Sequence, residues 1–461
     1  MSKKYFYVTL AGDNLKELEE LASNYDGDYI YDENIISVRI DNIRYEKLKK
    51  FLKDSPYARI IKRINFKEEK KFQISPYILE QKCINRTRNR FEGNLGMNFD
   101  NLFFKKYLNE SEIESSFNYM KRAFPKLINI EKLPEFTYDS KQSFLLKISS
   151  NSKNKKKGLF ITGGIHGNEW IPPESLIYFV KKLCFAYIKQ DYIKIGENIY
   201  DKIIIQKIAN NINFYIFPLV NPDGRKKSQS RISDNNMIGR KNNRPIENGN
   251  FGIDINRNFN FVWDYNKYFS HVPFSSKDPS HPNFIGNCPF SEPESKNVLF
   301  VANKYNSKIN FFLDIHTKEL GENLILYSWG NSKSQTKYPD LNFSNHNYWN
   351  KHGTDYYGEY VNSKDLEFRK NIARNMALAS SKVSHHQKKY FAKTANNLYL
   401  MSGASRDFME SLSKQDTNSN TIHSFMIEAS EKSFNPSIYR RRRMINEICA
   451  SILELCVQII K

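Results

Sequence analysis

Two histidines and one glutamate in this chain have the residue types and the order of a hydrolytic metal site. His166 and Glu169 lie in the segment Gly-Gly-Ile-His-Gly-Asn-Glu-Trp, and His316 follows much later in Phe-Leu-Asp-Ile-His-Thr. Two imidazoles and one carboxylate are a ligand set of catalytic zinc, which keeps its fourth tetrahedral position open for water or a substrate carbonyl. Ligand type alone does not exclude another divalent ion.

The residues around this set indicate how the fold would bring it together. Residues 158–165 form a short apolar run leading into two glycines, which is typical of a buried strand. Pro172 and Pro173 follow where a helix would begin, because proline is tolerated in a first turn. Residues 309–315 are a second apolar run that ends directly before His316. Open α/β sheets bind ligands at the carboxyl ends of their strands, so we expect both segments to deliver ligands there.

Further short motifs follow in a fixed order. They are Asn-Pro-Asp-Gly at 221–224, Arg-Lys at 240–241, Asp-Ile-Asn-Arg-Asn-Phe at 254–259, Pro-Phe-Ser-Glu-Pro-Glu-Ser at 289–295, Ser-Gly-Ala-Ser-Arg-Asp-Phe at 402–408 and Phe-Met-Ile-Glu at 425–428. Together with the two histidine segments, they resemble the zinc metallocarboxypeptidases of the carboxypeptidase A type. The resemblance implies an α/β fold, with a mostly parallel, twisted, mixed sheet covered by helices on both faces. It also implies one bound zinc ion.

The resemblance implies a role for each matching residue. Glu428 would be the general base that takes a proton from water and passes it to the leaving amine. Asn256 and Arg257 would bind the C-terminal carboxylate of the substrate, since a guanidinium fork suits a carboxylate. Arg240 would stabilise the oxyanion, and Arg244 is an alternative because this polar loop is hard to align.

Three further positions refine this picture. Tyr399 would close over the substrate and hydrogen-bond the peptide. Asp254 could orient His166 by accepting its outer ring N–H. The family often has an arginine between the histidine and the glutamate of its first motif, whereas this chain has Asn168. That departure puts contacts upstream of the scissile bond in doubt, but not catalysis.

Arg406 suggests the specificity. In the family, this position lies at the base of the pocket for the C-terminal side chain. A guanidinium in a pocket needs an anionic partner, because an unpaired buried charge is costly. We therefore predict release of C-terminal Glu or Asp. The alternative is that Arg406 faces solvent or pairs internally with Asp407 or Glu410.

The sequence thus predicts a zinc-dependent hydrolase, a metallocarboxypeptidase acting on acidic peptide or protein C-termini. Two alternatives stay open. One is an amidohydrolase of cell-wall γ-glutamyl-diaminopimelate links on the same scaffold, where Arg406 would grip the carboxylated side chain. The other is a non-catalytic peptide-binding module, which would be expected to lack a ligand or the base.

Composition limits the remaining possibilities. The chain has 461 residues, five cysteines and a formal net charge of +20. No apolar run approaches the ~20 residues of a membrane helix, and the N-terminus lacks a secretory apolar region. An odd number of cysteines without a Cys-x-x-Cys pair favours a reducing compartment, so we expect a cytoplasmic protein. We attribute the basic charge mainly to composition and expect no nucleic-acid partner. The oligomeric state is not indicated.

The chain divides into two predicted domains. Residues 1–65 alternate strand-like and helical segments in the order β-α-β-β-α-β, which is typical of a ferredoxin-like module. Such a module could be a removable pro-segment or a permanent accessory. Residues 66–94 would be a linker and residues 95–461 the catalytic domain.

Within the catalytic part, apolar strands and helices alternate. Strands are expected at 143–148, 158–165, 214–219, 309–315, 324–328 and 424–427. Helices are expected at 174–187, 292–305, 364–382 and 437–460, after a first helix near residue 110 capped by Asn109 or Ser111. The polar stretches 188–210, 226–250 and 264–290 are expected to be loops around the rim of the site.

Overall fold

The computed structural model describes most of the chain from residue 106 onward and four strands before it. The described backbone comprises residues 5–12, 28–32, 35–41, 61–68, 106–230, 237–246, 249–265, 274–327, 363–383, 389–395, 401–415 and 420–461. The chain divides into two compact units, residues 1–107 with 436–442 and residues 108–435 with 443–461. The predicted boundaries at 65 and 95 stay predictions.

Four strands are described in the N-terminal part of the chain. They are β1 (Tyr5–Gly12), β2 (Asp28–Asp32), β3 (Ile35–Asp41) and β4 (Ile61–Glu68). They pair antiparallel in the order β2-β3-β1-β4. Residues 13–27 and 42–60, where two helices are predicted, lie outside the described part, so the ferredoxin-like module also stays a prediction.

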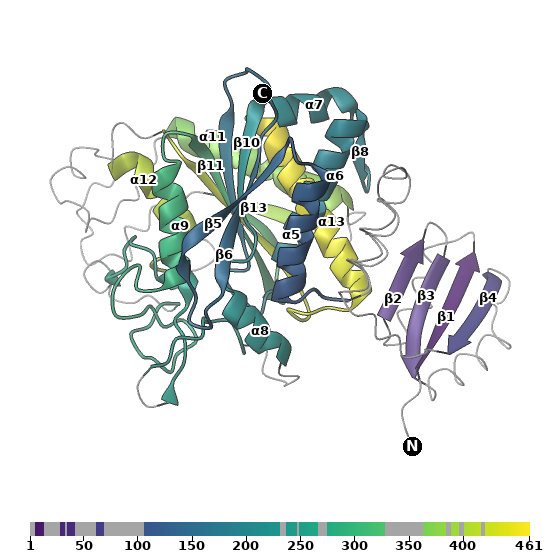
Figure 1. The fold of residues 1–461 in the computed structure, drawn as a ribbon, viewed down its shortest axis with the longest axis horizontal. Coiled ribbons are helices and arrows are strands. Elements are labelled where there is room, and N and C mark those ends of the chain that lie inside the picture. The colour runs from purple at the N-terminus through teal and green to yellow at the C-terminus, as the bar shows by residue number, and fades with distance from the viewer. Residues whose placement is uncertain are drawn as a thin grey trace. The chain divides into compact units, whose positions relative to one another are not determined.

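A mixed sheet of eight described strands is the framework of the larger unit (Figure 1). Its order is β13-β12-β14-β11-β7-β10-β6-β5. The central neighbours β14, β11, β7 and β10 run parallel, and antiparallel pairs flank them on both sides. The strands are β5 (Ile128–Phe136), β6 (Gln142–Ile148), β7 (Lys157–Gly163), β10 (Ile212–Phe217), β11 (Ile309–Glu319), β12 (Asn323–Tyr327), β13 (Tyr390–Thr394) and β14 (His423–Glu431).

Helices cover both faces of this sheet, as predicted. Figure 1 shows α5, α6 and α13 on one side and α9 and α12 on the other. The helices are α5 (Glu110–Ala123), α6 (Ile171–Lys189), α7 (Lys202–Asn211), α8 (Pro222–Ser230), α9 (Pro293–Lys304), α11 (Ser363–Val383), α12 (Ser405–Gln415) and α13 (Ile438–Ile459). Asn109 caps α5, where it accepts a hydrogen bond from the Glu112 N–H and its own N–H donates to the Glu112 carboxylate.

One predicted rim loop is wrong. Residues 188–210 contain the hairpin β8 (Ile193–Ile195) and β9 (Asn198–Tyr200), followed by most of α7. The side chain of Asp201 accepts from the Ile204 N–H at 2.8 Å and so caps α7. Because α7 leads into the first residue of β10, this stretch lies at the amino end of that strand, away from the edge where ligands are expected.

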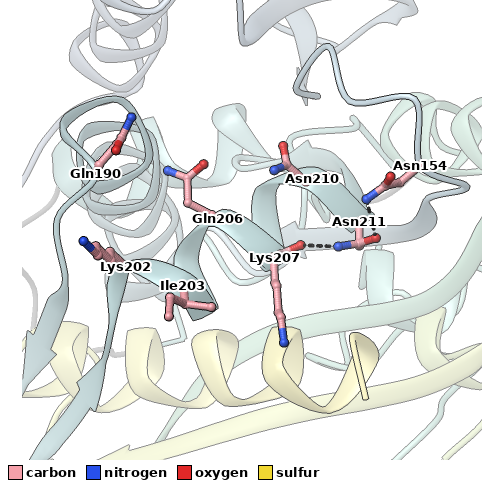
Figure 2. Close-up of a pocket in the computed structure, with 8 residues that line it drawn as sticks. All are labelled: Asn154, Gln190, Lys202, Ile203, Gln206, Lys207, Asn210 and Asn211. Atoms are coloured by element: carbon pink, nitrogen blue, oxygen red, sulfur yellow. Dashed lines mark hydrogen bonds between the residues drawn. The ribbon is translucent and has the colours of Figure 1, made fainter.

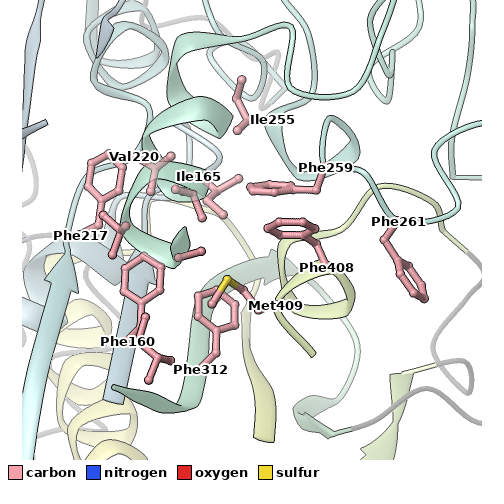
Figure 3. Close-up of a cluster of buried hydrophobic side chains, with 14 of the residues drawn as sticks. Phe160, Ile165, Phe217, Val220, Ile255, Phe259, Phe261, Phe312, Phe408 and Met409 are labelled. Carbon is pink, nitrogen blue, oxygen red and sulfur yellow. The ribbon is translucent and has the colours of Figure 1, made fainter. Parts of the chain in front are cut away.

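A buried aromatic cluster connects the sheet to the segments that carry the site (Figure 3). Phe160 on β7 and Phe312 on β11 pack with ring centroids 5.4 Å apart. Phe259 stacks on Phe408 of α12 at 5.7 Å. Full burial of one such ring contributes roughly 1.5–3 kcal/mol, so this cluster fixes the segment around residue 259 and the start of α12 against the sheet.

Among the described helices, none combines the length and the apolarity that a membrane crossing requires.

Candidate metal centre

The three predicted ligands converge on one point. The Nδ1 atom of His166 lies 2.6 Å from Glu169 Oε1, and the Nδ1 atom of His316 lies 3.2 Å from Glu169 Oε2. Ligand atoms from all three residues lie within 4.8 Å of one another, and all three side chains are buried. A tetrahedral zinc ion with bonds of about 2.0–2.1 Å has ligand atoms about 3.3 Å apart, so contacts of this length are compatible with zinc binding.

The outer ring nitrogens are occupied, which turns both Nδ1 atoms toward the centre. His166 Nε2 lies 3.1 Å from Asp254 Oδ1, and His316 Nε2 lies 2.9 Å from Asp314 Oδ2. A carboxylate on the outer nitrogen sets the tautomer that presents the other nitrogen to a metal. This donor arrangement fits zinc independently of the sequence motifs. Asp254 was predicted to orient His166, whereas Asp314 was not singled out.

Strand register places Glu428 beside the centre. His316 on β11 is paired with Glu428 on β14, and directly paired residues present their side chains on the same face. Glu428 is 7% exposed, and its carboxylate forms no hydrogen bond with the described residues. Burial raises the pKa of Glu428, and Glu169 raises it further, while His316 and Lys318 oppose the shift.

The Asn-Pro-Asp-Gly motif supports the loop that carries His166. A Cβ on Gly167 would lie 2.2 Å from the carbonyl carbon of Gly224, so only glycine permits this contact between the two backbones. Asn221 accepts from the Gly224 N–H at 2.8 Å, and its Nδ2 donates to the Arg240 carbonyl at 3.3 Å. The motif therefore joins the metal-ligand loop to the segment that carries Arg240.

A buried ion pair fixes the other end of the ligand loop. Arg225 donates from Nη2 to Glu174 at 3.0 Å and from Nη1 to the Trp170 carbonyl at 2.9 Å. Both charged side chains are fully buried. The same guanidinium donates from Nε to the Leu108 carbonyl, so the first residue of the larger unit is joined to this loop.

The two candidate oxyanion arginines have different surroundings. Arg240 donates from Nη2 to Asp254 at 2.8 Å, and its Nη1 lies 3.3 Å from His166 Nδ1, next to the metal-facing atom. Arg244 instead donates to Glu292 at 2.6 Å, and its Cζ lies 5.8 Å from the centroid of the Tyr138 ring. The geometry therefore favours Arg240 as the arginine of the site.

Asn256 and Arg257 lie in one buried turn beside the metal centre. Asn256 Nδ2 lies 3.2 Å from His316 Nε2, and its Oδ1 accepts from the Ser405 N–H at 2.9 Å. Arg257 donates from Nη1 to the Asn256 carbonyl and from Nε to the Phe274 carbonyl. Its Nη2 makes no hydrogen bond with the described residues, so one side of the guanidinium is available to a ligand.

Arg406 opens α12 next to this turn. Gly403, at φ +63°, brings the two segments together, and a Cβ there would lie 2.2 Å from the Arg257 carbonyl oxygen. Arg406 is 2% exposed and forms an ion pair with Asp407. Burial raises the pKa of Asp407 to about 6, although Arg406 and Arg257 lower it. The internal pairing considered from the sequence is thus present, within the electrostatic reach of Arg257.

Tyr399 lies outside the described residues, so its predicted role is not tested.

A model of the family described as zinc carboxypeptidase matches residues 113–447. This match covers well over half of the chain and includes all three ligand candidates. The chain belongs to the zinc carboxypeptidase family.

Curated relatives agree with this membership. Human carboxypeptidase O is 32% identical over 207 residues, which are 44% of this chain and 48% of that protein. Human mast cell carboxypeptidase A is 28% identical over 240 residues, covering 52% of this chain and 51% of the relative. The chain therefore spans about half the length of the curated relatives it matches.

Solved structures of zinc carboxypeptidases share the fold. Thrombin activatable fibrinolysis inhibitor superposes with a TM-score of 0.58 at 19% identity, covering 100% of this chain and 99% of the other. Carboxypeptidase A from Helicoverpa armigera gives 0.57 at 18% identity, covering 99% and 97%. At such low identity the likeness shows the fold alone.

Sequence reasoning missed one member of this zinc carboxypeptidase site. Asp314 accepts hydrogen bonds from Thr162 Oγ1 at 2.8 Å and from Ser405 Oγ at 2.5 Å, besides contacting His316. A signal was present, because Asp314 lies two residues before His316 on a strand and so shares its face. The partner serine could not be inferred, since it comes from α12, far along the chain.

A separate cavity of about 330 Å³ lies around α7 (Figure 2). Its lining holds amides, two lysines and one isoleucine, and no metal-ligating acid or histidine: Asn154, Gln190, Lys202, Ile203, Gln206, Lys207, Asn210 and Asn211. It lies at the amino end of β10 and is not part of the metal centre.

Proposed function

We propose that this protein is a zinc-dependent metallocarboxypeptidase that removes one C-terminal residue and prefers Glu or Asp. One observation carries the hydrolytic part. A zinc-competent ligand set lies on the same sheet face as Glu428, a buried carboxylate without a hydrogen bond to the described residues. A general base must lie near the metal without ligating it, and Glu428 meets this condition.

Zinc held by His166, Glu169 and His316 would polarise the scissile carbonyl and lower the pKa of its bound water. Glu428 accepts a proton from the attacking water and passes it to the nitrogen of the leaving amine. Arg240 lies beside the metal-facing atom of His166, where it donates to the carbonyl oxygen as negative charge develops there.

Arg257 accounts for the requirement for a free chain end. Its unused Nη2 can bind the terminal carboxylate, and the adjacent Asn256 lies against His316, which limits the distance from that carboxylate to the metal. An arginine in this place selects substrates whose last peptide bond lies at the metal centre when their terminal carboxylate is bound.

Arg406 supports the preference for acidic residues. Its Nε has no partner among the described residues, and its bond from Nη1 to the Tyr327 carbonyl is long, at 3.5 Å. The guanidinium therefore has donors left for a second carboxylate besides Asp407. Burial raises the pKa of Asp407 to about 6, so this carboxyl is mostly ionised near neutral pH and a substrate carboxylate would share Arg406 with it.

The test is release of the last residue from matched peptides ending in Glu, Asp, Leu, Phe, Lys or Arg, with and without a chelator. We expect chelator-sensitive release, fastest for Glu or Asp. Arg406→Gln should lower the ratio of Glu to Leu release about a hundredfold, as expected for a desolvated charge contact. Asp407→Asn should raise that ratio, because it removes the competing carboxylate.

Arg369→Gln is the matched control, since Arg369 is equally buried and pairs with Glu410. It should affect stability without changing the ratio. Faster release of Leu than of Glu by the unmodified protein would exclude the acidic preference while leaving the carboxypeptidase intact. Cleavage of γ-glutamyl-diaminopimelate fragments, with no peptide cleaved, would favour the amidohydrolase instead.

A further inference from the structure

Two buried asparagines form hydrogen bonds with the first turn of α9. Each of them belongs to a segment that carries an arginine of the site. This turn comes from the Ser-Glu-Pro-Glu-Ser stretch, to which neither the metal centre nor the proposed chemistry gives a role. Glu292, Glu294 and Ser295 are all fully buried there. Their polar atoms bind Asn242 and Asn258.

Asn242 fixes the backbone next to Arg240. Its Nδ2 donates to Glu292 at 2.7 Å and to Glu294 at 3.1 Å. Its Oδ1 accepts from the Ile253 N–H at 2.9 Å, and its own N–H donates to the Ile253 carbonyl at 3.1 Å. Ile253 directly precedes Asp254, the residue that contacts Arg240. Asn242 therefore sets the register between the segment of Arg240 and that of its partner.

The charge balance around Asn242 is consistent with a rigid anchor. Glu292 is neutralised by Arg244 at 2.6 Å. Burial raises the pKa of Glu294 to about 8, with further contributions from Glu292 and Asp223, so this acid is protonated at neutral pH. Two carboxyl groups can thus share one amide without two buried negative charges.

Asn258 fixes the backbone next to Arg257. Its Oδ1 accepts from the Glu292 N–H at 3.2 Å and from Ser295 Oγ at 2.7 Å. Its Nδ2 donates to the carbonyls of Ile285 and Cys288 at 3.0 and 3.1 Å. Asn258, Ile285 and Cys288 lie on irregular backbone, so side-chain bonds replace the strand pairing that would otherwise fix the segment.

We propose that the first turn of α9 is a positioning hub that sets Arg240 through Asn242 and Arg257 through Asn258. The proposal rests on the roles given to these arginines under the proposed function. Neither asparagine touches substrate in this scheme; each acts through the arginine two residues before it or directly before it.

The two branches of the hub have different kinetic consequences. Arg240 acts on charge that develops in the transition state, so its misplacement lowers kcat with little change in KM. Arg257 binds a carboxylate that is present in the ground state, so its misplacement raises KM and weakens inhibition by the released amino acid. A purely structural role of the asparagines would not separate these quantities.

The experiment compares Asn242→Leu, Asn258→Leu and Asn297→Leu in the full-length, zinc-loaded protein. Asn297 is the matched control, since it is fully buried on the same helix but binds the backbone of Glu135 on β5. The measurements are kcat and KM on a peptide ending in Glu, the inhibition constant of free glutamate, zinc content and Tm.

We expect Asn242→Leu to lower kcat roughly tenfold to a hundredfold, with KM within about twofold. Asn258→Leu should raise KM and the inhibition constant of glutamate by about tenfold. Asn297→Leu should lower Tm comparably and change neither kinetic constant beyond about twofold. The same kinetic pattern in all three variants would overturn the hub.

Milder variants cover the case in which the leucine variants do not fold. Glu294→Met removes one acceptor from Asn242, and Ser295→Ala removes one donor from Asn258. We expect the first to lower kcat and the second to raise KM, each by less than the leucine variant does. The absence of this difference overturns the hub. Arg240→Ala and Arg257→Ala serve as references. If these do not lower kcat and raise KM respectively, the roles in the proposed function fail; if they do and the asparagine variants do not follow, only the hub fails.

Discussion

The metal centre and the arginine segments are built in different ways. At the metal centre, backbone pairing of β7, β11 and β14 sets the positions, since Thr162 is paired with Asp314 and His316 with Glu428. Arg240 and Arg257 lie on irregular backbone whose place is set by buried asparagines. Strand register spreads the positioning over many hydrogen bonds, whereas the loops concentrate it in a few side chains. Single substitutions should therefore affect positioning more in the loops than in the sheet.

The largest effect is expected where the sheet carries the chemistry itself. Glu428→Gln keeps the shape of the side chain and removes the base, so kcat should fall about a thousandfold or more. Zinc content and Tm should change little, because Glu428 does not bind the metal in this arrangement. Single-turnover cleavage of a Glu-ended peptide, with zinc measured on the same sample, checks this. Activity within tenfold of the unmodified protein would exclude Glu428 as the base.

The second prediction tests the loop anchors through stability. Glu294 keeps its proton up to about pH 8 in the folded state, whereas the unfolded residue loses it near its ordinary pKa of 4.5. Because the folded pKa is raised, the contribution of Glu294 to the free energy of unfolding is most favourable below about pH 4.5. That contribution decreases as the pH rises toward 8. Glutamine does not titrate, so folding of the Glu294→Gln variant requires no proton uptake at this position. The substitution should add about 3 kcal/mol to the free energy of unfolding at pH 7 and almost nothing at pH 4.

Chemical denaturation at the two pH values measures this difference. Glu292→Gln is the control, since it leaves Arg244 without its buried partner and should destabilise at both pH values. An equal effect of Glu294→Gln at pH 4 and pH 7 would show that folding does not raise the pKa of Glu294.

The third prediction concerns the carboxylates behind the histidines. Asp314→Asn should weaken zinc binding about tenfold to a hundredfold, because His316 loses the acceptor that sets its tautomer. Asp254→Asn should weaken zinc binding similarly and also lower kcat, since Asp254 binds Arg240 as well. Zinc competition against a chelator, together with kcat at saturating zinc, separates the two. Equal kcat for both variants at saturating zinc would argue against a role of Asp254 in placing Arg240.

The sequence predicted the sheet region well, for a physical reason. Buried central strands such as β7 and β11 are continuous apolar runs, and the residues after them are the ligands. The two sheet strands that the pattern missed, β5 and β13, are the two edges of the sheet. β5 contains Pro134 and a register shift, and such features are tolerated at an edge but weaken the alternation of apolar residues.

The loop region was predictable only by residue type. Arg240, Arg257 and Arg406 were chosen by resemblance to a family, and Arg240 could not be separated from Arg244. What separates them is Glu292, which directly precedes α9 and binds Arg244. Contacts between residues far apart in the chain produce no periodic pattern in the local sequence. Neither the hydrogen bond of Asn242 with Glu292 nor that of Ser405 with Asp314 could therefore be predicted from the sequence.

The smallest predicted effect tests how strongly the sheet face itself tunes the base. Lys318 lies two residues beyond His316 on β11 and therefore on the same face, and its charge lowers the pKa of Glu428. Activity requires unprotonated Glu428, so it rises with pH through that pKa. Lys318→Gln should move the acidic limb of the kcat/KM profile upward by less than about one pH unit. Lys393→Gln is the control, because Lys393 on β13 is paired with Glu322, directly before β12, and should leave the limb in place. An unchanged limb in the Lys318 variant would mean that the lysine does not face the base, and that strand register alone does not determine what surrounds the metal centre.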